Sequence, residues 1–285
     1  MDAAATEQSG KFSLVQILAD DLSGGNLELP SFPDIVMRIR KALADENVTI
    51  DKIVQIVGAD PVLAARVLTI SNSAVMRTAG DPITDLRTAV NRIGLTMVRN
   101  TAMSHGVQQA KQAVTLEAAK VCLDRMWDDC AQVAALCYVL ARQRTKLNAD
   151  DAMLIGLMHG IGKLYILGRA ESHPEFFNAE ADVEHVMNEW HAPIGSSILD
   201  SWGFEAHVSE AISNYADLER DHEGDVDYTD VLTMAHLIAE FLRAEQMEVQ
   251  LEHVPAARRL NLTTADMMPV LNESRDQIRD LKNAL

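Results

Sequence analysis

Apolar residues recur along most of the chain at spacings of three and four residues, which is the period of an amphipathic α-helix. Runs of strictly alternating apolar and polar residues between Asn-Gly or Asp-Gly turns are not found in the sequence, so β-hairpins are not predicted. The pattern therefore predicts an all-α fold. The expected helices cover, in chain order, residues 12–22, 33–44, 50–59, 61–72, 86–93, 95–109, 116–144, 149–167, 183–189, 193–202, 206–218, 228–245 and 264–284.

Several of these helices begin or end at residues suited to capping. Asp60 is followed by a proline, which gives the next helix both an N-cap and a favourable first residue, and Thr49 is placed in the same way one helix earlier. We expect Thr84 to cap the helix that follows it and Gly94 to end that helix. Asn72 is suited to the left-handed conformation in which many helices end.

The charge of the chain excludes several classes of partner. Its 285 residues include 25 Lys and Arg against 42 Asp and Glu, a formal net charge of −17. Binding to a phosphate backbone requires clustered cations that release counterions, so we expect no nucleic-acid partner. The same charge disfavours anionic membrane surfaces, and we expect no membrane partner.

The sequence predicts a cytoplasmic protein. The N-terminus has no basic stretch followed by an apolar core, so a signal peptide is not predicted. The most apolar stretch, residues 153–167, is interrupted by His159 and Lys163 and is too short to span a bilayer. The cysteines at 122, 130 and 137 are odd in number and too far apart on a helix to pair, which is typical of buried thiols in a reducing compartment.

Several short segments are informative when they are taken together. They are LPSFP at 29–33, ADPVLAARVL at 59–68, SNSA at 71–74, PITDLRTAVNRIG at 82–94, LMHGIGKL at 157–164 and EWHAPIG at 189–195. Any one of them alone is a weak signal, whereas the combination is specific. The chain resembles the HDOD family, a bacterial relative of the HD-domain metal-dependent phosphohydrolases, over residues 27–218.

The resemblance implies an N-terminal helical bundle packed on an HD-like helical lobe. We expect a helical extension over residues 1–26 and an HDOD-like domain over 27–218, divided into an N-terminal lobe (27–110) and an HD-like lobe (111–218). An acidic loop and closing helices are expected over 219–285, because the segment Glu219–Asp227 is acidic and poor in apolar residues. Members of the family are signalling or regulatory modules.

An HD-type phosphohydrolase needs a His on one helix, a His-Asp pair on the next and a further Asp on a later helix, because these groups bind the cations that activate water. Where the first His is expected, this chain has Asp129. Its spacing places it on one helix face with Met126, Val133, Leu136 and Leu140. A carboxylate on an apolar face needs a partner, either a ligand or another side chain, and we favour a structural pairing.

The His-Asp pair of the HD enzymes is replaced by His159-Gly160. The substitution removes one ligand and its negative charge, and glycine suits a close approach of neighbouring helices. We therefore interpret His159 as a hydrogen-bonded core histidine in preference to a metal ligand.

Two further histidines occupy family positions. His236 stands where the later Asp is expected, and His191 matches a histidine that is common in the family. Asn214-Tyr215 stands where a pair of histidines is often found. The polar groups that remain are Asp129, His159, His191 and His236, which we predict to line a ligand pocket at the vestigial HD site.

These residues predict a non-catalytic HDOD-type module that acts in signal transduction by binding a protein or a small ligand. No catalytic residue, no metal site and no cofactor is assigned. The alternative is a metal-dependent phosphohydrolase of the HD superfamily, with a divalent metal at the vestigial site and a nucleotide or phosphomonoester as substrate. The expected partner is a protein of a signalling pathway, and a small anionic ligand in the pocket is a third hypothesis.

Overall fold

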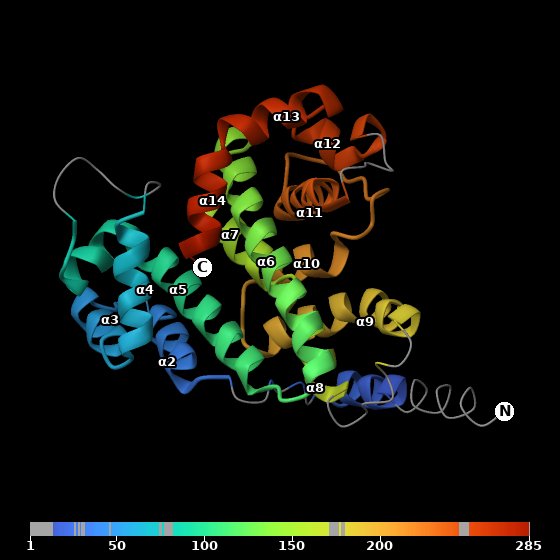
Figure 1. Cartoon of the computed structure of the whole chain (residues 1–285). Helices are drawn as coiled ribbons and strands as arrows, with labels where there is room; N and C mark the ends of the chain where they lie inside the picture. Colours follow the sequence, from blue (N-terminus) through green and yellow to red (C-terminus); the bar gives the residue numbers. More distant parts are fainter. Residues whose placement is uncertain are drawn as a thin grey trace.

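The structure is a computed structural model, and it describes residues 14–25, 27, 29, 32–45, 47–73, 76, 82–170, 177, 180–244 and 251–284. Residues 1–13 of the predicted N-terminal extension lie outside the described residues. Within the described ranges the chain is helical and contains no β-strand, which confirms the predicted all-α fold (Figure 1).

A first helix covers residues 14–24. The helices that follow are α2 (Asp34–Leu43), α3 (Ile50–Val57), α4 (Pro61–Ser71), α5 (Leu86–Ala113), α6 (Glu117–Arg144), α7 (Ala149–Met158), α8 (Ile161–Ala170), α9 (Glu180–Ser201), α10 (Ala206–Asn214), α11 (Tyr228–Ala244), α12 (Pro255–Arg259), α13 (Thr264–Glu273) and α14 (Arg275–Ala284), with a 3-10 turn at Leu251–His253 before α12.

Helices α2 to α5 form the N-terminal bundle, in which α5 packs against each of the other three. The predicted caps at its helix starts are present. The Thr49 side chain accepts a hydrogen bond from the backbone N–H of Lys52, and the Asp60 carboxylate accepts from two N–H groups of the first turn of α4. Gly94 interrupts α5 with a φ of 77°, so the break predicted at this residue is a kink inside one long helix.

Two of the predicted helix ends are wrong in detail. Asp85, not Thr84, caps α5 by accepting the N–H of Thr88. Asn72 is not left-handed, since its φ is −100°. Its amide side chain instead donates to the carbonyl of Ile83 (2.9 Å) and accepts the N–H of the same residue (2.8 Å), which closes the connection between α4 and α5.

Helix α6 is the centre of the second lobe and contacts α7, α8, α11 and α14. Glycines allow the closest approaches in this lobe. A Cβ on Gly156 would lie 2.7 Å from the Cα of Ala134 on α6, and a Cβ on Gly162 would overlap the backbone carbonyl of His191 on α9. The glycine-rich helix predicted from the sequence therefore does allow neighbouring backbones to approach closely.

Four predicted helices have different bounds in the structure. The helix expected over 149–167 is divided at His159-Gly160 into α7 and α8, because glycine has low helix propensity. The two helices expected on either side of Pro193 are one helix, α9, because packing against α8 and α10 outweighs the hydrogen bond that proline removes. The helix expected over 264–284 is two helices, α13 and α14, and α12 was not predicted.

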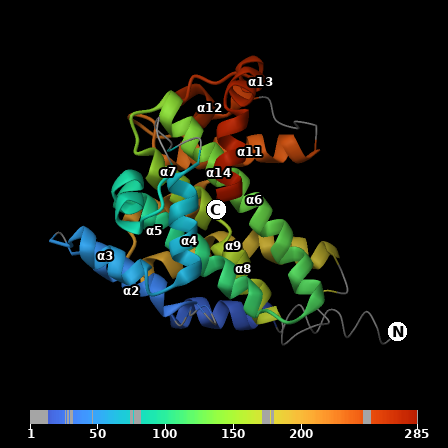
Figure 2. The ribbon, with the colours of Figure 1, turned by 60° about the vertical axis from the view of Figure 1, so that its left-hand side comes forward.

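Each end of the described chain packs against a distant part of the sequence. In the helix over 14–24, the Asp21 carboxylate accepts a hydrogen bond from the Tyr165 hydroxyl (2.7 Å) and pairs with Arg169 (2.9 Å), both on α8. At the other end, α14 packs on α6 of the second lobe and also contacts α4 of the N-terminal bundle (Figure 2).

Candidate functional site

Three histidines on three different helices gather around one tyrosine. His159 follows α7, His191 lies on α9 and His236 lies on α11. Their ring centroids lie 5.6, 5.9 and 5.0 Å from that of Tyr215, at the end of α10. The His159 and His236 rings are also in edge-to-face contact at 5.8 Å. We call His159, His191, His236 and Tyr215 the histidine pocket.

His191 has both ring nitrogens engaged. Nδ1 lies 2.6 Å from the carbonyl of Met187, and Nε2 lies 2.6 Å from the hydroxyl of Tyr215. Burial lowers the pKa of His191 from 6.5 to about 4, and the positive charge of Lys163 adds to this effect. The ring is therefore neutral at physiological pH. Because Nδ1 must donate to a carbonyl, Nε2 of the neutral ring accepts the hydrogen bond of Tyr215.

His159 is similarly buried, with 1 % of its surface exposed. Its Nδ1 lies 2.6 Å from the carbonyl of Gly156, one turn earlier. Burial holds its pKa well below 6.5, and the charges of His236 and Lys163 act in the same direction. The geometry agrees with the interpretation of His159 as a hydrogen-bonded core histidine.

Asp129 lies at the edge of the site, where its side chain is 39 % exposed. Its Oδ2 is 2.8 Å from the Arg243 guanidinium on α11. Arg243 also approaches Glu240 (3.9 Å), and Glu240 pairs with His236 at 3.3 Å. Asp129 is thus paired structurally, as we favoured from the sequence, and a chain of charged contacts joins it to the histidine pocket.

The place of the missing aspartate is filled by a sulfur atom. A Cβ added to Gly160 would lie closer than 3.0 Å to the Sγ of Cys130 and 3.3 Å from Cγ of Met126, both on α6. Burial raises the pKa of the Cys130 thiol to about 12, so it remains protonated. Residue 160 therefore lacks a carboxylate, and any larger side chain there would require Cys130 to change conformation.

Sequence reasoning assigned no site role to Tyr215, Lys163, Glu240 or Arg243. Helical spacing could have identified three of them as neighbours of the histidines. Lys163 follows His159 by four residues, and Glu240 and Arg243 follow His236 by four and seven. Tyr215 has no spacing signal, and the clue to it is its place at a family position where histidines are common. It reaches His191 through the packing of α10 against α9. Burial raises its pKa above 10, so its hydroxyl keeps the proton that it donates.

Comparison with known proteins agrees with this architecture. The family model of the HDOD domain matches residues 29–218, two thirds of the chain. This chain belongs to the HDOD family. An uncharacterized protein of Treponema pallidum (strain Nichols) is 22 % identical over 231 residues, which are 76 % of this chain and 43 % of that protein. The chain thus spans less than half the length of this curated relative.

Solved structures share the fold of this HDOD protein. A proposed metal-dependent phosphohydrolase from Shewanella amazonensis SB2B is 27 % identical, with a TM-score of 0.75 over 97 % of this chain and 99 % of its own. An HDOD domain protein of unknown function from Geobacter sulfurreducens is 21 % identical, with a TM-score of 0.66 over 95 % and 97 %. A proposed signal transduction protein from Marinobacter aquaeolei VT8 is 20 % identical, with a TM-score of 0.63 over 100 % and 66 %.

The HD relatives of the family imply a metal site, and the residues of this HDOD protein do not fit one. Gly160 offers no ligand, and Cys130 fills the space beside it with a protonated thiol. Both nitrogens of His191 are used in hydrogen bonds, and Asp129 is paired with Arg243. A bound cation would have to displace these partners, and Glu240, the carboxylate that the described residues place next to the histidines, is half exposed.

A second group of His and Asp side chains lies in the acidic loop before α11. Ligand atoms of His222, Asp227 and Asp230 lie within 4.8 Å of one another. The positive charge between the two carboxylates is already supplied by Arg220, which is 2.6 Å from Asp227 and 3.5 Å from Asp230. His222 Nε2 lies 3.0 Å from the buried Asp230. We call these four residues the acidic-loop cluster. Its hydrogen bonds and ion pairs connect the loop to the start of α11.

None of the helices in the described ranges is both long enough and apolar enough to cross a membrane.

Proposed function

We propose that this HDOD protein is a non-catalytic regulatory module, whose histidine pocket supports a binding or conformational response in signal transduction. The observation that carries this proposal is the contact between Gly160 and Cys130. At the position where an HD enzyme holds a metal-binding carboxylate, this chain has a glycine, and the Sγ of Cys130 occupies the space that a side chain there would enter.

The hydrogen bonds of the pocket support the same proposal. His159, His191 and Tyr215 are almost fully buried. Nδ1 of each histidine lies against a backbone carbonyl, and Nε2 of His191 lies against the hydroxyl of Tyr215. Groups that satisfy one another in this way stabilise a packed core. A catalytic site would instead need open positions for substrate and water.

The competing proposal is a metal-dependent phosphohydrolase acting on a nucleotide or phosphomonoester. It is favoured by the convergence of three histidines in one pocket and by the likeness to the Shewanella amazonensis protein. A small anionic ligand without turnover is a third proposal, because the Lys163 ammonium acts on the charges of His159, His191 and Glu240.

Metal content and hydrolysis distinguish the first two proposals. The full chain, incubated with Mn²⁺, Ni²⁺ or Zn²⁺ and then dialysed, should retain far less than one equivalent of metal. It should also fail to hydrolyse p-nitrophenyl phosphate and bis-p-nitrophenyl phosphate in the presence of these ions. Retention of about one equivalent, lost in His159→Ala and kept in the surface control His185→Gln, would contradict the non-catalytic proposal.

For the small-ligand proposal, a thermal-shift panel of nucleotides and inorganic phosphate is the appropriate measurement. A rise in Tm that is absent in Lys163→Ala would support an anion in the pocket. A flat panel would leave protein binding as the mode of action.

A further inference from the structure

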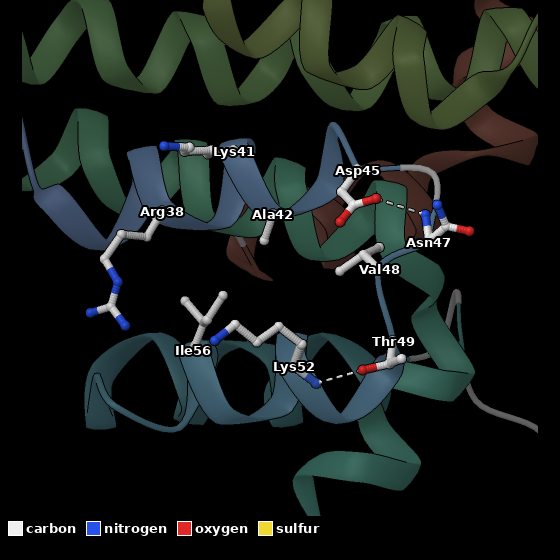
Figure 3. Close-up of a pocket in the computed structure, with 9 residues that line it drawn as sticks. All are labelled: Arg38, Lys41, Ala42, Asp45, Asn47, Val48, Thr49, Lys52 and Ile56. Carbon is white, nitrogen blue, oxygen red and sulfur yellow. Dashed lines mark hydrogen bonds between the residues drawn. The ribbon is translucent and has the colours of Figure 1, made fainter.

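A groove runs between α2 and α3, on the N-terminal bundle and away from the histidine pocket. It encloses about 540 Å³ and is open to solvent along its length. Figure 3 shows Arg38 from α2 and Lys52 from α3 reaching toward the space between the helices. The residues that line the groove are Arg38, Lys41, Ala42, Asp45, Asn47, Val48, Thr49, Lys52 and Ile56.

The cations of the groove have no ionic partner among the described residues. Arg38, Lys41 and Lys52 are all exposed, and none of them takes part in an ion pair within the part of the chain that the structure describes. Elsewhere, cations such as Arg99 and Arg243 are paired with carboxylates. The groove thus brings together three cations that have no ion pair among the described residues, in a chain with 17 more acidic than basic residues.

The described acidic residues near the groove do not pair with its cations. Asp45 is the acid among the described residues of the lining, and its Oδ1 accepts the N–H of Asn47 (2.9 Å) at the end of the groove (Figure 3). Asp51, next to Lys52 in sequence, pairs with Arg87 on α5. The described lining therefore carries three cations against one carboxylate.

The lining also has an apolar component. Ala42 and Val48 are half-buried, Ile56 is buried, and the three lie between α2 and α3 (Figure 3). No aromatic ring belongs to the described part of the lining, which therefore has no platform on which a nucleobase could stack. Cations at the rim with aliphatic side chains below them suit a peptide that alternates carboxylates with apolar side chains.

Long-range repulsion does not prevent such a peptide from binding. At physiological ionic strength the Debye length is about 8 Å, so the carboxylates of a bound segment interact with the cations of the groove more than with acids elsewhere on the chain. Local complementarity then decides the choice of partner, and the net charge of −17 disfavours acidic segments at other sites.

We propose that the α2–α3 groove docks an acidic, partly apolar peptide segment of a partner protein. This docking site adds to the proposed function a surface and the chemistry of the partner. It rests on the proposed function because a regulatory module acts through a partner.

Selection from a phage-displayed random peptide library on the immobilised full chain tests the proposal. We expect enrichment of peptides that combine Asp and Glu with aliphatic residues. A selected peptide, measured by fluorescence anisotropy, should bind the double variant Arg38→Glu/Lys52→Glu at least about tenfold more weakly, and its affinity should fall as salt is raised. Both positions are exposed, and an unchanged Tm will show that the variant is folded.

The matched control is Lys146→Glu, because Lys146 is an exposed cation on the α6–α7 connection with no ion pair among the described residues. This variant should bind the peptide as the natural chain does. Failure to enrich acidic peptides would overturn the proposal, as would a selected peptide that binds equally to Arg38→Glu/Lys52→Glu. Binding of single-stranded DNA or ATP that is lost in the same double variant would assign the groove to phosphate and overturn it too.

The outcome is separable from that of the proposed function. The metal and hydrolysis assays are run on Arg38→Glu/Lys52→Glu as well as on the natural chain. Hydrolysis that persists in this variant, together with peptide binding by the natural chain, would overturn the non-catalytic proposal and leave the docking groove standing. If neither hydrolysis nor peptide binding is found, the docking groove is overturned and the non-catalytic proposal stands.

Discussion

The Sγ of Cys130 lies where the first side-chain atoms of any larger residue at Gly160 would have to be placed. The two residues come from α6 and from the junction of α7 and α8, so the fit joins the central helix of the second lobe to the histidine pocket.

We expect Gly160→Asp to destabilise the chain by about 2 kcal/mol or more, because Cys130 must rotate and a carboxylate is buried without a partner. Removal of the sulfur in Gly160→Asp/Cys130→Ala should recover part of this loss. Urea unfolding of both variants and of Cys130→Ala alone gives the coupling free energy between the two positions. Strictly additive effects would contradict the steric relationship.

Two glycines of α8 should respond to alanine in opposite ways. Gly162→Ala places a Cβ against the backbone carbonyl of His191, which cannot move without separating α8 from α9, so we expect a loss of about 3 kcal/mol. Gly168→Ala meets no atom within 4 Å and should be neutral or stabilise the helix by up to about 1 kcal/mol. Thermal unfolding of the two variants is the measurement, and similar Tm values would refute the packing argument.

The stability of the chain should fall as the pH falls from 6.5 toward 4. His191 has its pKa lowered to about 4 by burial, and that of His159 is lowered too, so the unfolded chain binds more protons than the folded chain in this range. The contribution is fully present above pH 6.5 and is lost as the pH approaches the folded-state values. For His191 it amounts to about 3 kcal/mol.

Unfolding free energies measured between pH 7 and 5 check this expectation. Carboxylates with lowered pKa values, such as Glu240, lose their contribution only below about pH 4.5, so the histidines dominate the upper range. His191→Gln should flatten the slope, whereas the exposed His185→Gln should leave it unchanged. A slope that His191→Gln does not alter would show that another group titrates there.

The acidic-loop cluster should stabilise the chain without metal. Asp230 is 1 % exposed and accepts hydrogen bonds from the backbone of Asp227 and from His222, so Asp230→Ala leaves Arg220 partly unpaired. We expect a loss of about 3 kcal/mol. Asp225→Ala is the control, because Asp225 lies in the same loop and is exposed. A rise in Tm of the natural chain with Zn²⁺ or Mn²⁺, abolished by Asp230→Ala, would instead identify a cation site.

The fold was largely readable from the sequence because its signals are local. The period of apolar residues predicts the helices, and Thr49 and Asp60 mark helix starts with side chains that act within three residues. Pro193 and Asn72 show where local rules fail. The proline lies inside α9 because tertiary packing holds the helix on both sides of it, and Asn72 bonds to Ile83, eleven residues away.

The site was less predictable, for a related reason. The positions of His159, His191 and His236 follow from sequence motifs, but their partners do not. The hydrogen bond of Tyr215 to His191 and the ion pair of Arg243 with Asp129 join residues 24 and 114 positions apart. The match of Cys130 to Gly160 is likewise visible only once α6 and α7 are packed together.

The attachments of the two chain ends bear on how the molecule folds and unfolds. The helix over 14–24 precedes the N-terminal bundle in sequence and is fastened to α8, while α14 follows the second lobe and returns to α4. These contacts have large sequence separations, so loop closure slows their formation, and the second lobe is complete only when both helices have docked. The chain should therefore behave as one cooperative unit, in which loss of either terminal helix loosens the lobe at the opposite end of the sequence.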